Sequence, residues 1–213
     1  MEKPQATLVV AQAPMCLLHA WPLITRLKTN FRWKIVYLTR SKDDGHNSEM
    51  AKAWANTGVE LEFLQLEHVN EDEENFEISF DRELATTKIE TACAGSDLLV
   101  THNHLGEYGH VYHVFVNSVV AEIDIPKVYF GYSDDNDNNL LILPKTYGNL
   151  KIPCDILEWT AKWIEQATPH GKYQCDPEAI EVLKEHTNGL NFDVAGKKDG
   201  LNNSLTRRSL NAL

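Results

Sequence analysis

Residues 97–114 read DLLVTHNHLGEYGHVYHV, and this segment indicates both a fold and a site. Its first residues, DLLV, are typical of a buried strand. The polar part that follows holds four of the chain's 9 histidines. A strand that runs into such a loop places nitrogen ligands at the C-terminal edge of a sheet, where open α/β folds keep their sites.

Outward from this segment, short apolar runs alternate with amphipathic stretches. Strands are predicted at residues 6–11, 33–39, 59–66, 97–101, 126–132 and 140–143, and helices at 15–27, 48–56, 81–94, 111–121, 156–166 and 177–187. This alternation predicts an α/β fold with a mostly parallel sheet and helices on both faces. We expect one domain over residues 1–190 and a polar tail over 191–213 with the composition of a flexible segment.

The net charge and the hydropathy pattern argue against two kinds of partner, nucleic acid and a lipid bilayer. The net charge is -11, which argues against a nucleic-acid partner. No apolar run approaches the roughly 20 residues that a membrane helix needs. The N-terminal residues lack the layout of a signal peptide, so we expect a cytoplasmic protein with no membrane span. The sequence does not fix an oligomeric state.

The histidines are spaced as metal ligands often are. His110 and His113 are three residues apart, so a helix that begins near His110 carries both on one face. His102 and His104 are two apart, so on extended backbone they point the same way. Neutral imidazole is a common zinc ligand. The alternative is a polar loop whose histidines cap the following helix and bond to backbone.

Two further side chains of this loop suit catalysis. Tyr108 offers a phenol that can donate to a developing oxyanion. Glu107 can orient a ligand or take a proton. Glycines on either side of this pair, Gly106 and Gly109, let the backbone bend tightly.

Residues 101–114 resemble the second motif of the PIG-L/LmbE-like deacetylases: Thr-His-Asn, a spacer, Gly-Glu-Tyr-Gly-His, two residues, then His-Val. These are zinc-dependent hydrolases with a Rossmann-like fold that remove acetyl groups from N-acetylglucosamine-type sugars. The resemblance implies that His113 is a zinc ligand, that His110 steadies or protonates the transition state, and that Tyr108 polarises the amide carbonyl. The family usually has Asp where this chain has Tyr112.

The remaining candidates complete the expected site. We assign Glu107 to catalysis with His110 and Tyr108. We assign His102, Asn103 and His104 to binding of the substrate, a sugar or glycan precursor.

The family's first motif, His-Pro-Asp-Asp-Glu, is degenerate in this chain. After the first predicted strand the sequence reads Ala13-Pro14-Met15-Cys16-Leu17. Alanine replaces a ligand histidine, methionine replaces the general base, and Cys16 stands where the second ligand belongs. These replacements remove a standard site of two histidines and one carboxylate.

Two interpretations follow from this loss. In the first, Cys16 and His19 join His113 in a rewired zinc site, or Cys16 does so with His102 and His113, because thiolate binds zinc well. The chain would then act on N-acetylated sugars by metal-water hydrolysis of the acetamide. In the second, the chain descends from such enzymes and is a non-catalytic module that binds a glycan or a protein. A buried thiol at Cys16 and a surface histidine at His19 would fit the second.

A second enzyme class has weaker support. Asp135 and Asp137, after the fifth predicted strand, have the spacing with which sugar-nucleotide transferases hold a divalent cation. Clusters of Asp and Asn after strands also form turns, which is the alternative here.

Overall fold

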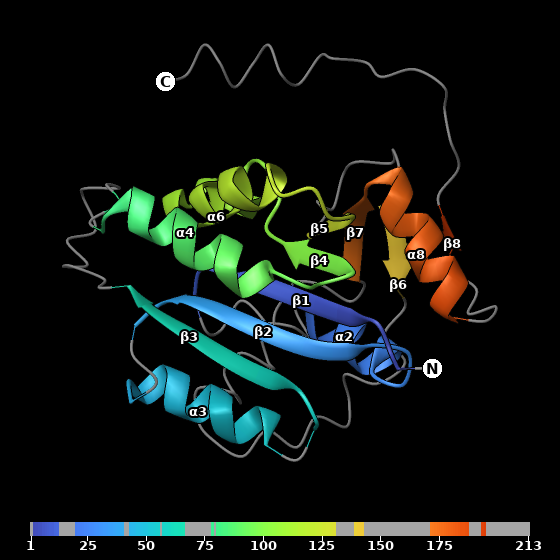
Figure 1. Cartoon of the computed structure of the whole chain (residues 1–213), viewed down its shortest axis with the longest axis horizontal. Coiled ribbons are helices and arrows are strands. Elements are labelled where there is room, and N and C mark those ends of the chain that lie inside the picture. The colour runs from blue at the N-terminus through green and yellow to red at the C-terminus, as the bar shows by residue number, and fades with distance from the viewer. Residues whose placement is uncertain are drawn as a thin grey trace, which may run out of the picture.

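The chain forms an α/β fold around one sheet, as a computed structural model shows (Figure 1). The structure describes residues 2–12, 20–40, 43–55, 57–66, 78, 80–130, 139–142, 171–187 and 193–194. Within these residues the sheet has eight strands in the order β3-β2-β1-β4-β5-β7-β6-β8. The Rossmann-like, mostly parallel arrangement that the sequence predicts is confirmed.

The parallel part of the sheet contains five strands. They are β1 Gln5–Val10, β2 Arg32–Thr39, β3 Glu60–Leu66, β4 Leu98–Thr101 and β5 Lys127–Phe130. Every neighbouring pair among them is parallel. Most of β1, β2 and β4 is buried, as expected for parallel strands that are covered on both faces. All five coincide with strands predicted from the sequence.

The remaining strands are antiparallel. Strand β7 (Gly171–Cys175) pairs with β5 on one side and with β6 (Asn139–Ile142) on the other. The short β8 (Asp193–Val194) pairs with β6. Strand β6 was predicted, whereas β7 and β8 were not. The predicted helix at 156–166 lies outside the described residues.

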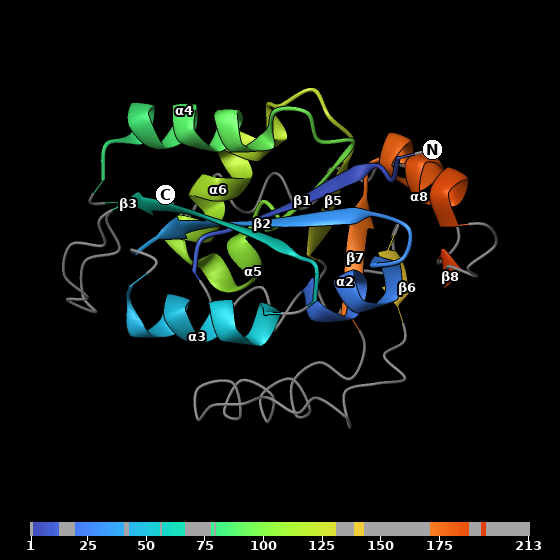
Figure 2. The same ribbon diagram turned by 60° about the horizontal axis from the view of Figure 1, so that its bottom comes forward.

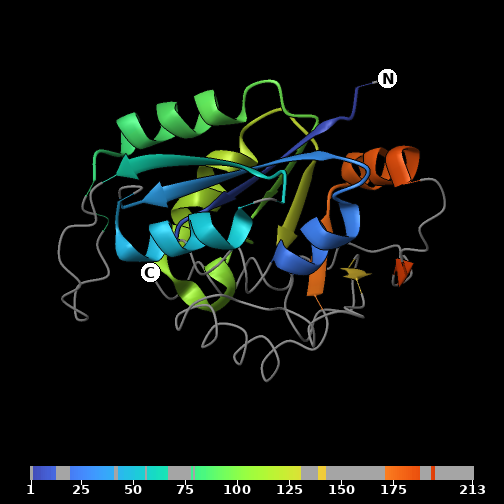
Figure 3. The same ribbon diagram turned by 90° about the horizontal axis from the view of Figure 1, so that it is seen from below.

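Helices cover both faces of the sheet, as predicted. One face packs against α2 (Trp21–Leu27), α3 (Gly45–Trp54) and α8 (Pro177–Thr187). The other packs against α4 (Arg82–Cys93) and α6 (Val111–Ala121). Figure 2 shows α4 and α3 on opposite sides of the strands, and Figure 3 shows α2 and α3 from their own side. Each face therefore has its own apolar core.

The ends of these helices follow local chemistry. Asp81 precedes α4 and accepts hydrogen bonds from the main-chain N–H groups of Glu83 and Leu84, a helix N-cap. Pro22 lies in the first turn of α2, where its missing N–H leaves no helical bond unmade. The predicted helix over 15–27 therefore includes α2 at its C-terminal end, and residues 13–19 lie outside the described residues.

Strands β1 and β4 are neighbours and end side by side. Val9 is in register with Thr101, and the Thr101 hydroxyl donates to the Val9 carbonyl at 3.0 Å. From these ends the chain leaves in opposite directions across the sheet, because β1 leads to β2 and β4 leads to β5. Such a switch point is where ligands bind in open α/β folds. None of the helices in the described part of the chain is long and apolar enough to cross a bilayer.

Candidate functional site

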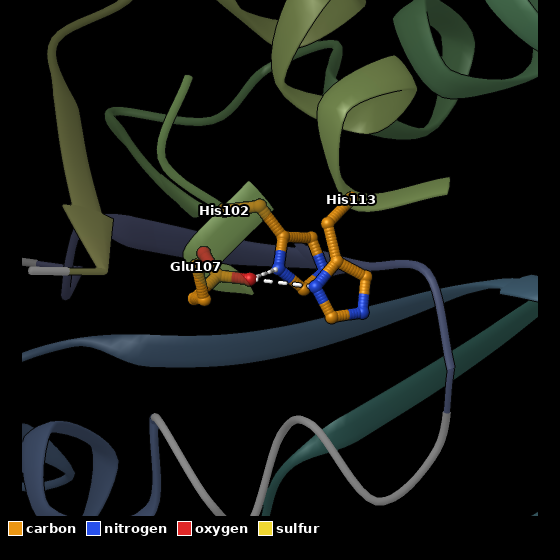
Figure 4. Close-up of side chains that lie close together, drawn as sticks. All are labelled: His102, Glu107 and His113. Carbon is orange, nitrogen blue, oxygen red and sulfur yellow. Dashed lines mark hydrogen bonds and ion pairs between the residues drawn. The ribbon is translucent and has the colours of Figure 1, made fainter. Parts of the chain in front are cut away.

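Three side chains from the predicted motif meet beyond the C-terminal ends of β1 and β4 (Figure 4). His102 directly follows β4, and Glu107 lies in the short helix α5 (Gly106–Gly109). His113 lies in the first turn of α6. One ligand atom from each of the three lies within 4.8 Å of the others.

Glu107 joins the two histidines through one carboxylate oxygen. Its Oε2 atom lies 2.7 Å from Nδ1 of His102 and 2.6 Å from Nδ1 of His113. The other oxygen, Oε1, accepts the main-chain N–H of Asn103 at 2.9 Å. The Glu107 side chain is 7% exposed and both imidazoles are 0% exposed. Three N–H groups thus converge on one buried carboxylate, as buried charge requires.

The main chain directly after β1 determines the tautomer of His102. The N–H of Ala11 donates to Nε2 of His102 at 3.1 Å, so this nitrogen carries no proton. The proton of the neutral ring is therefore on Nδ1, which donates it to Glu107. We assign the same Nδ1–H form to His113, whose Nδ1 faces the same oxygen.

Helix α5 has an unusual backbone. Gly106 and Glu107 have φ values of 61° and 59°. These values lie in the left-handed region, which residues other than glycine rarely adopt. A Cβ atom on Gly106 would lie 2.9 Å from Cγ2 of Val114 and 3.1 Å from Cβ of His113. The close approach explains why glycine is needed here, and the left-handed turn directs the Glu107 carboxylate back toward the two histidines.

His110 extends the cluster. Its ring stacks on that of His113, with centroids 4.5 Å apart and planes inclined by 28°. The side-chain amide of Gln12, two residues past β1, lies 3.4 Å from Nε2 of His110. His110 is partly buried, and it precedes α6 with extended backbone. The three histidines thus form a continuous stack between the ends of β1 and α6.

Asn117 belongs to this arrangement although it lies outside the motif of residues 101–114. It lies four residues after His113 on the buried face of α6, and its Nδ2 donates to the carbonyl of His102 at 2.8 Å. The available signal was a polar residue within the apolar face of a helix. A buried amide needs a partner, and here that partner is the backbone of the site.

Other predicted residues are less completely placed. His104 is exposed in the turn before α5, and Asn103 is 1% exposed. Tyr108 lies in α5, with its side chain outside what the structure describes. Cys16, His19, Asp135 and Asp137 all lie outside the described residues.

The cluster could hold a metal ion, since two imidazoles and a carboxylate are donors that zinc binds. The distances between these atoms, however, indicate which of them could bind the metal directly. Zinc bonds of about 2.0–2.1 Å place two tetrahedral ligand atoms about 3.3 Å apart. The separations of 2.7 and 2.6 Å at Glu107 Oε2 are instead those of shared protons.

The residues fit a metal best through His113. A metal-bound histidine commonly donates its second ring N–H to a carboxylate, which fixes the orientation of the ring. Glu107 does this for Nδ1 of His113, so Nε2 is the nitrogen that would reach an ion. His102 already receives the Ala11 N–H on its own Nε2. Both ring nitrogens of His102 are therefore used in hydrogen bonds, which favours a structural role for His102 over a role as a metal ligand.

Comparison with solved structures identifies proteins with a similar fold. The chain is similar to GalB, the 4-carboxy-2-hydroxymuconate hydratase of Pseudomonas putida, with a TM-score of 0.55, 11% identity, and coverage of 76% of this chain and 83% of that one. This similarity shows the fold alone.

Two deacetylases match with lower scores. One is the pseudoaglycone deacetylase Dbv21, with a TM-score of 0.48, 10% identity and coverage of 89% and 86%. The other is N,N'-diacetylchitobiose deacetylase of Pyrococcus horikoshii, with a TM-score of 0.45, 11% identity and coverage of 91% and 82%. No protein-family model and no curated protein matches the sequence.

Proposed function

We propose that the chain is a PIG-L/LmbE-like deacetylase-family protein, which acts on N-acetylated sugars or descends from enzymes that do. The observation that carries the proposal is the bridge from Glu107 to His113, because it orients a histidine as metal sites require. The bridge stands at the end of β4, the position that α/β folds use for ligands. The motif of residues 101–114 supplies the family.

The fold by itself does not select the reaction. GalB, which is similar in structure, is named as a hydratase. The choice of acetamide hydrolysis therefore rests on the sequence motif, and the substrate class is inferred from it.

In this proposal, different residues bind the metal, orient its ligand and stabilise the oxyanion. His113 would hold the metal, with Cys16 and His19 as the further ligands expected from the sequence. When bound, zinc would lower the pKa of a water molecule toward about 7. Glu107 orients the His113 ring, since three N–H groups already occupy its oxygens. His110 and Tyr108 would face the developing oxyanion, with His110 placed to hold or transfer a proton.

Metal content tests this proposal directly. Protein purified without added metal is analysed by elemental analysis, beside His113→Ala and the control His186→Ala. His186 packs against Phe31, which directly precedes β2 and so lies at the opposite end of the parallel strands from the cluster. We expect zinc in the wild type and in His186→Ala, and its loss in His113→Ala. Release of acetate from N-acetylglucosamine conjugates would then be assayed. An absence of zinc even after incubation with zinc contradicts a metal-dependent enzyme.

One observation favours the alternative of a non-catalytic module that binds a glycan or a protein. The sequence Ala13-Pro14-Met15-Cys16-Leu17 lacks the family's general base. For this alternative, calorimetry should detect binding of N-acetylated oligosaccharides that chelator treatment does not weaken. A loss of that binding with chelator would favour the enzyme.

A further inference from the structure

Asn103 is the residue around which the loop after β4 is built. It is 1% exposed, and its Nδ2 donates to the Phe130 carbonyl at the end of β5, at 2.9 Å. Its Oδ1 accepts the main-chain N–H groups of Leu105 at 2.9 Å and Glu107 at 3.2 Å. Its own main-chain N–H donates to Oε1 of Glu107 at 2.9 Å. Asn103 therefore contacts both the backbone and the carboxylate of Glu107.

These contacts fix a conformation that Glu107 would not adopt alone. With φ at 59°, Glu107 is in the left-handed region, which is unfavourable for a residue with a Cβ atom. Such a conformation persists only where the surroundings hold it. The amide of Asn103 holds the backbone N–H of Glu107, while β5 holds the amide.

We propose that Asn103 is a positioning residue that acts through Glu107 on the ring of His113, and that it does not contact the substrate. The chain of contacts runs from the Phe130 carbonyl to the Asn103 amide, then through the Glu107 backbone and carboxylate to Nδ1 of His113. The inference rests on the proposed function only where it concerns the metal affinity of His113.

The readout is the tautomer of the imidazoles, which long-range proton–nitrogen correlation spectra report. In the wild type, His102 and His113 should both show the Nδ1–H form. In Asn103→Ala, the left-handed turn loses its support and the carboxylate leaves Nδ1 of His113. The His113 ring should then show the Nε2–H form or exchange between the two forms. His102 should keep Nδ1–H, because the Ala11 N–H still occupies its Nε2.

Thr101→Val is the matched control. It removes one buried hydrogen bond to backbone from the residue two positions earlier, without a contact to Glu107. We expect unchanged tautomers in this variant. If Asn103→Ala does not fold, Asn103→Ser replaces it, since a serine hydroxyl still accepts from the turn but loses the bond to Phe130. A folded Asn103 variant whose His113 remains in the Nδ1–H form overturns the proposal. So does a loss of the Nδ1–H form of His113 in Thr101→Val.

Zinc titrations of the single variants and of the Asn103→Ala/Glu107→Ala double variant test whether Asn103 acts through Glu107. Asn103→Ala should lower zinc affinity about 10- to 100-fold, the effect typical of a lost supporting contact. In a Glu107→Ala background the same change should have no further effect, because Asn103 acts through Glu107. Equal losses in both backgrounds would overturn that route. If the wild type binds no zinc, the proposed function fails, yet the tautomers still decide the role of Asn103.

Discussion

The ring of His102 stacks on the ring of His113, with centroids 3.9 Å apart and planes inclined by 14°. The two rings come from different elements, the loop after β4 and the first turn of α6. Both hold Nδ1 against the same oxygen of Glu107. The stack thus fastens α6 to the end of the sheet, and a change at Glu107 acts on both elements at once.

Glu107→Gln should destabilise the protein although it preserves size. The amide has only one oxygen, so its NH₂ group must face either the two Nδ1–H groups or the Asn103 N–H. We expect the free energy of unfolding to fall by about 1–3 kcal/mol, the cost of leaving buried donors unsatisfied. Urea unfolding measures it. Glu83→Gln, on the exposed surface of α4, should change stability by less than about 0.5 kcal/mol. Equal effects in the two variants would contradict a buried carboxylate bridge.

Gly106→Ala should be costlier than Gly58→Ala. Both glycines have positive φ, 61° and 79°, so both variants lose about 1–2 kcal/mol through the backbone. Around Gly58 a new Cβ meets nothing within 4 Å among the described residues, whereas at Gly106 it meets Val114 Cγ2 at 2.9 Å.

The overlap should add about 1–3 kcal/mol in Gly106→Ala. Thermal melts of both variants measure the difference. Val114→Ala should partly rescue Gly106→Ala, because it removes the nearest atom. The absence of any rescue would show that the contact with Val114 Cγ2 does not account for the loss.

Asn117→Ala should weaken the join between α6 and β4. The amide donates to the His102 carbonyl from a buried position, so its removal breaks this buried hydrogen bond. We expect a loss of about 1–3 kcal/mol in urea unfolding. Ser118→Ala removes a hydroxyl that bonds within the same helix from the exposed side, and its effect should stay within about 0.5 kcal/mol. A cost at Ser118 as large as that at Asn117 would contradict this assignment.

Cys93 should resist alkylation and make stability fall at high pH. Burial raises the pKa of its thiol to about 12, from a usual value of 9.0. At pH 8 the native thiol is therefore almost wholly protonated and unreactive. Iodoacetamide labelling followed by mass spectrometry should modify Cys93 in urea but hardly at all in the native protein.

The sign of the pH effect follows from the same shift. Between pH 9 and 12 the unfolded chain has lost the Cys93 proton while the native protein retains it. The unfolded state thus binds fewer protons, and the free energy of unfolding falls as pH rises through this range. Cys93→Ala should reduce that slope in urea titrations at pH 8, 9 and 10. An unchanged slope would refute the contribution of this thiol.

Strong periodicity made much of the fold predictable. Helices α6 and α8 have the predicted bounds of 111–121 and 177–187, because both carry a clear apolar face. Strand β7 was missed because its sequence, GKYQC, lacks an apolar run and gains its pairing from distant residues, such as Val128 with Cys175. Helix α5 was missed because two of its four residues are glycines, which indicate a loop.

The candidate site was predictable in composition but not in its connections. The motif suggested that Glu107 could orient a ligand, and the geometry places it against His113. The bond from Ala11 to His102 had no signal in the sequence, since it depends on the register of β1 beside β4. Main-chain donors do not depend on residue type, so a sequence motif cannot record them.

The carboxylate bridge at Glu107 has a consequence for how such chains diverge. Its hydrogen bonds fasten α6 to the sheet whether or not an ion is present. Selection for folding alone would therefore retain Glu107 and both histidines after chemistry was lost. The motif of residues 101–114 would therefore stay recognisable even in a chain of this fold that binds no metal and catalyses no reaction.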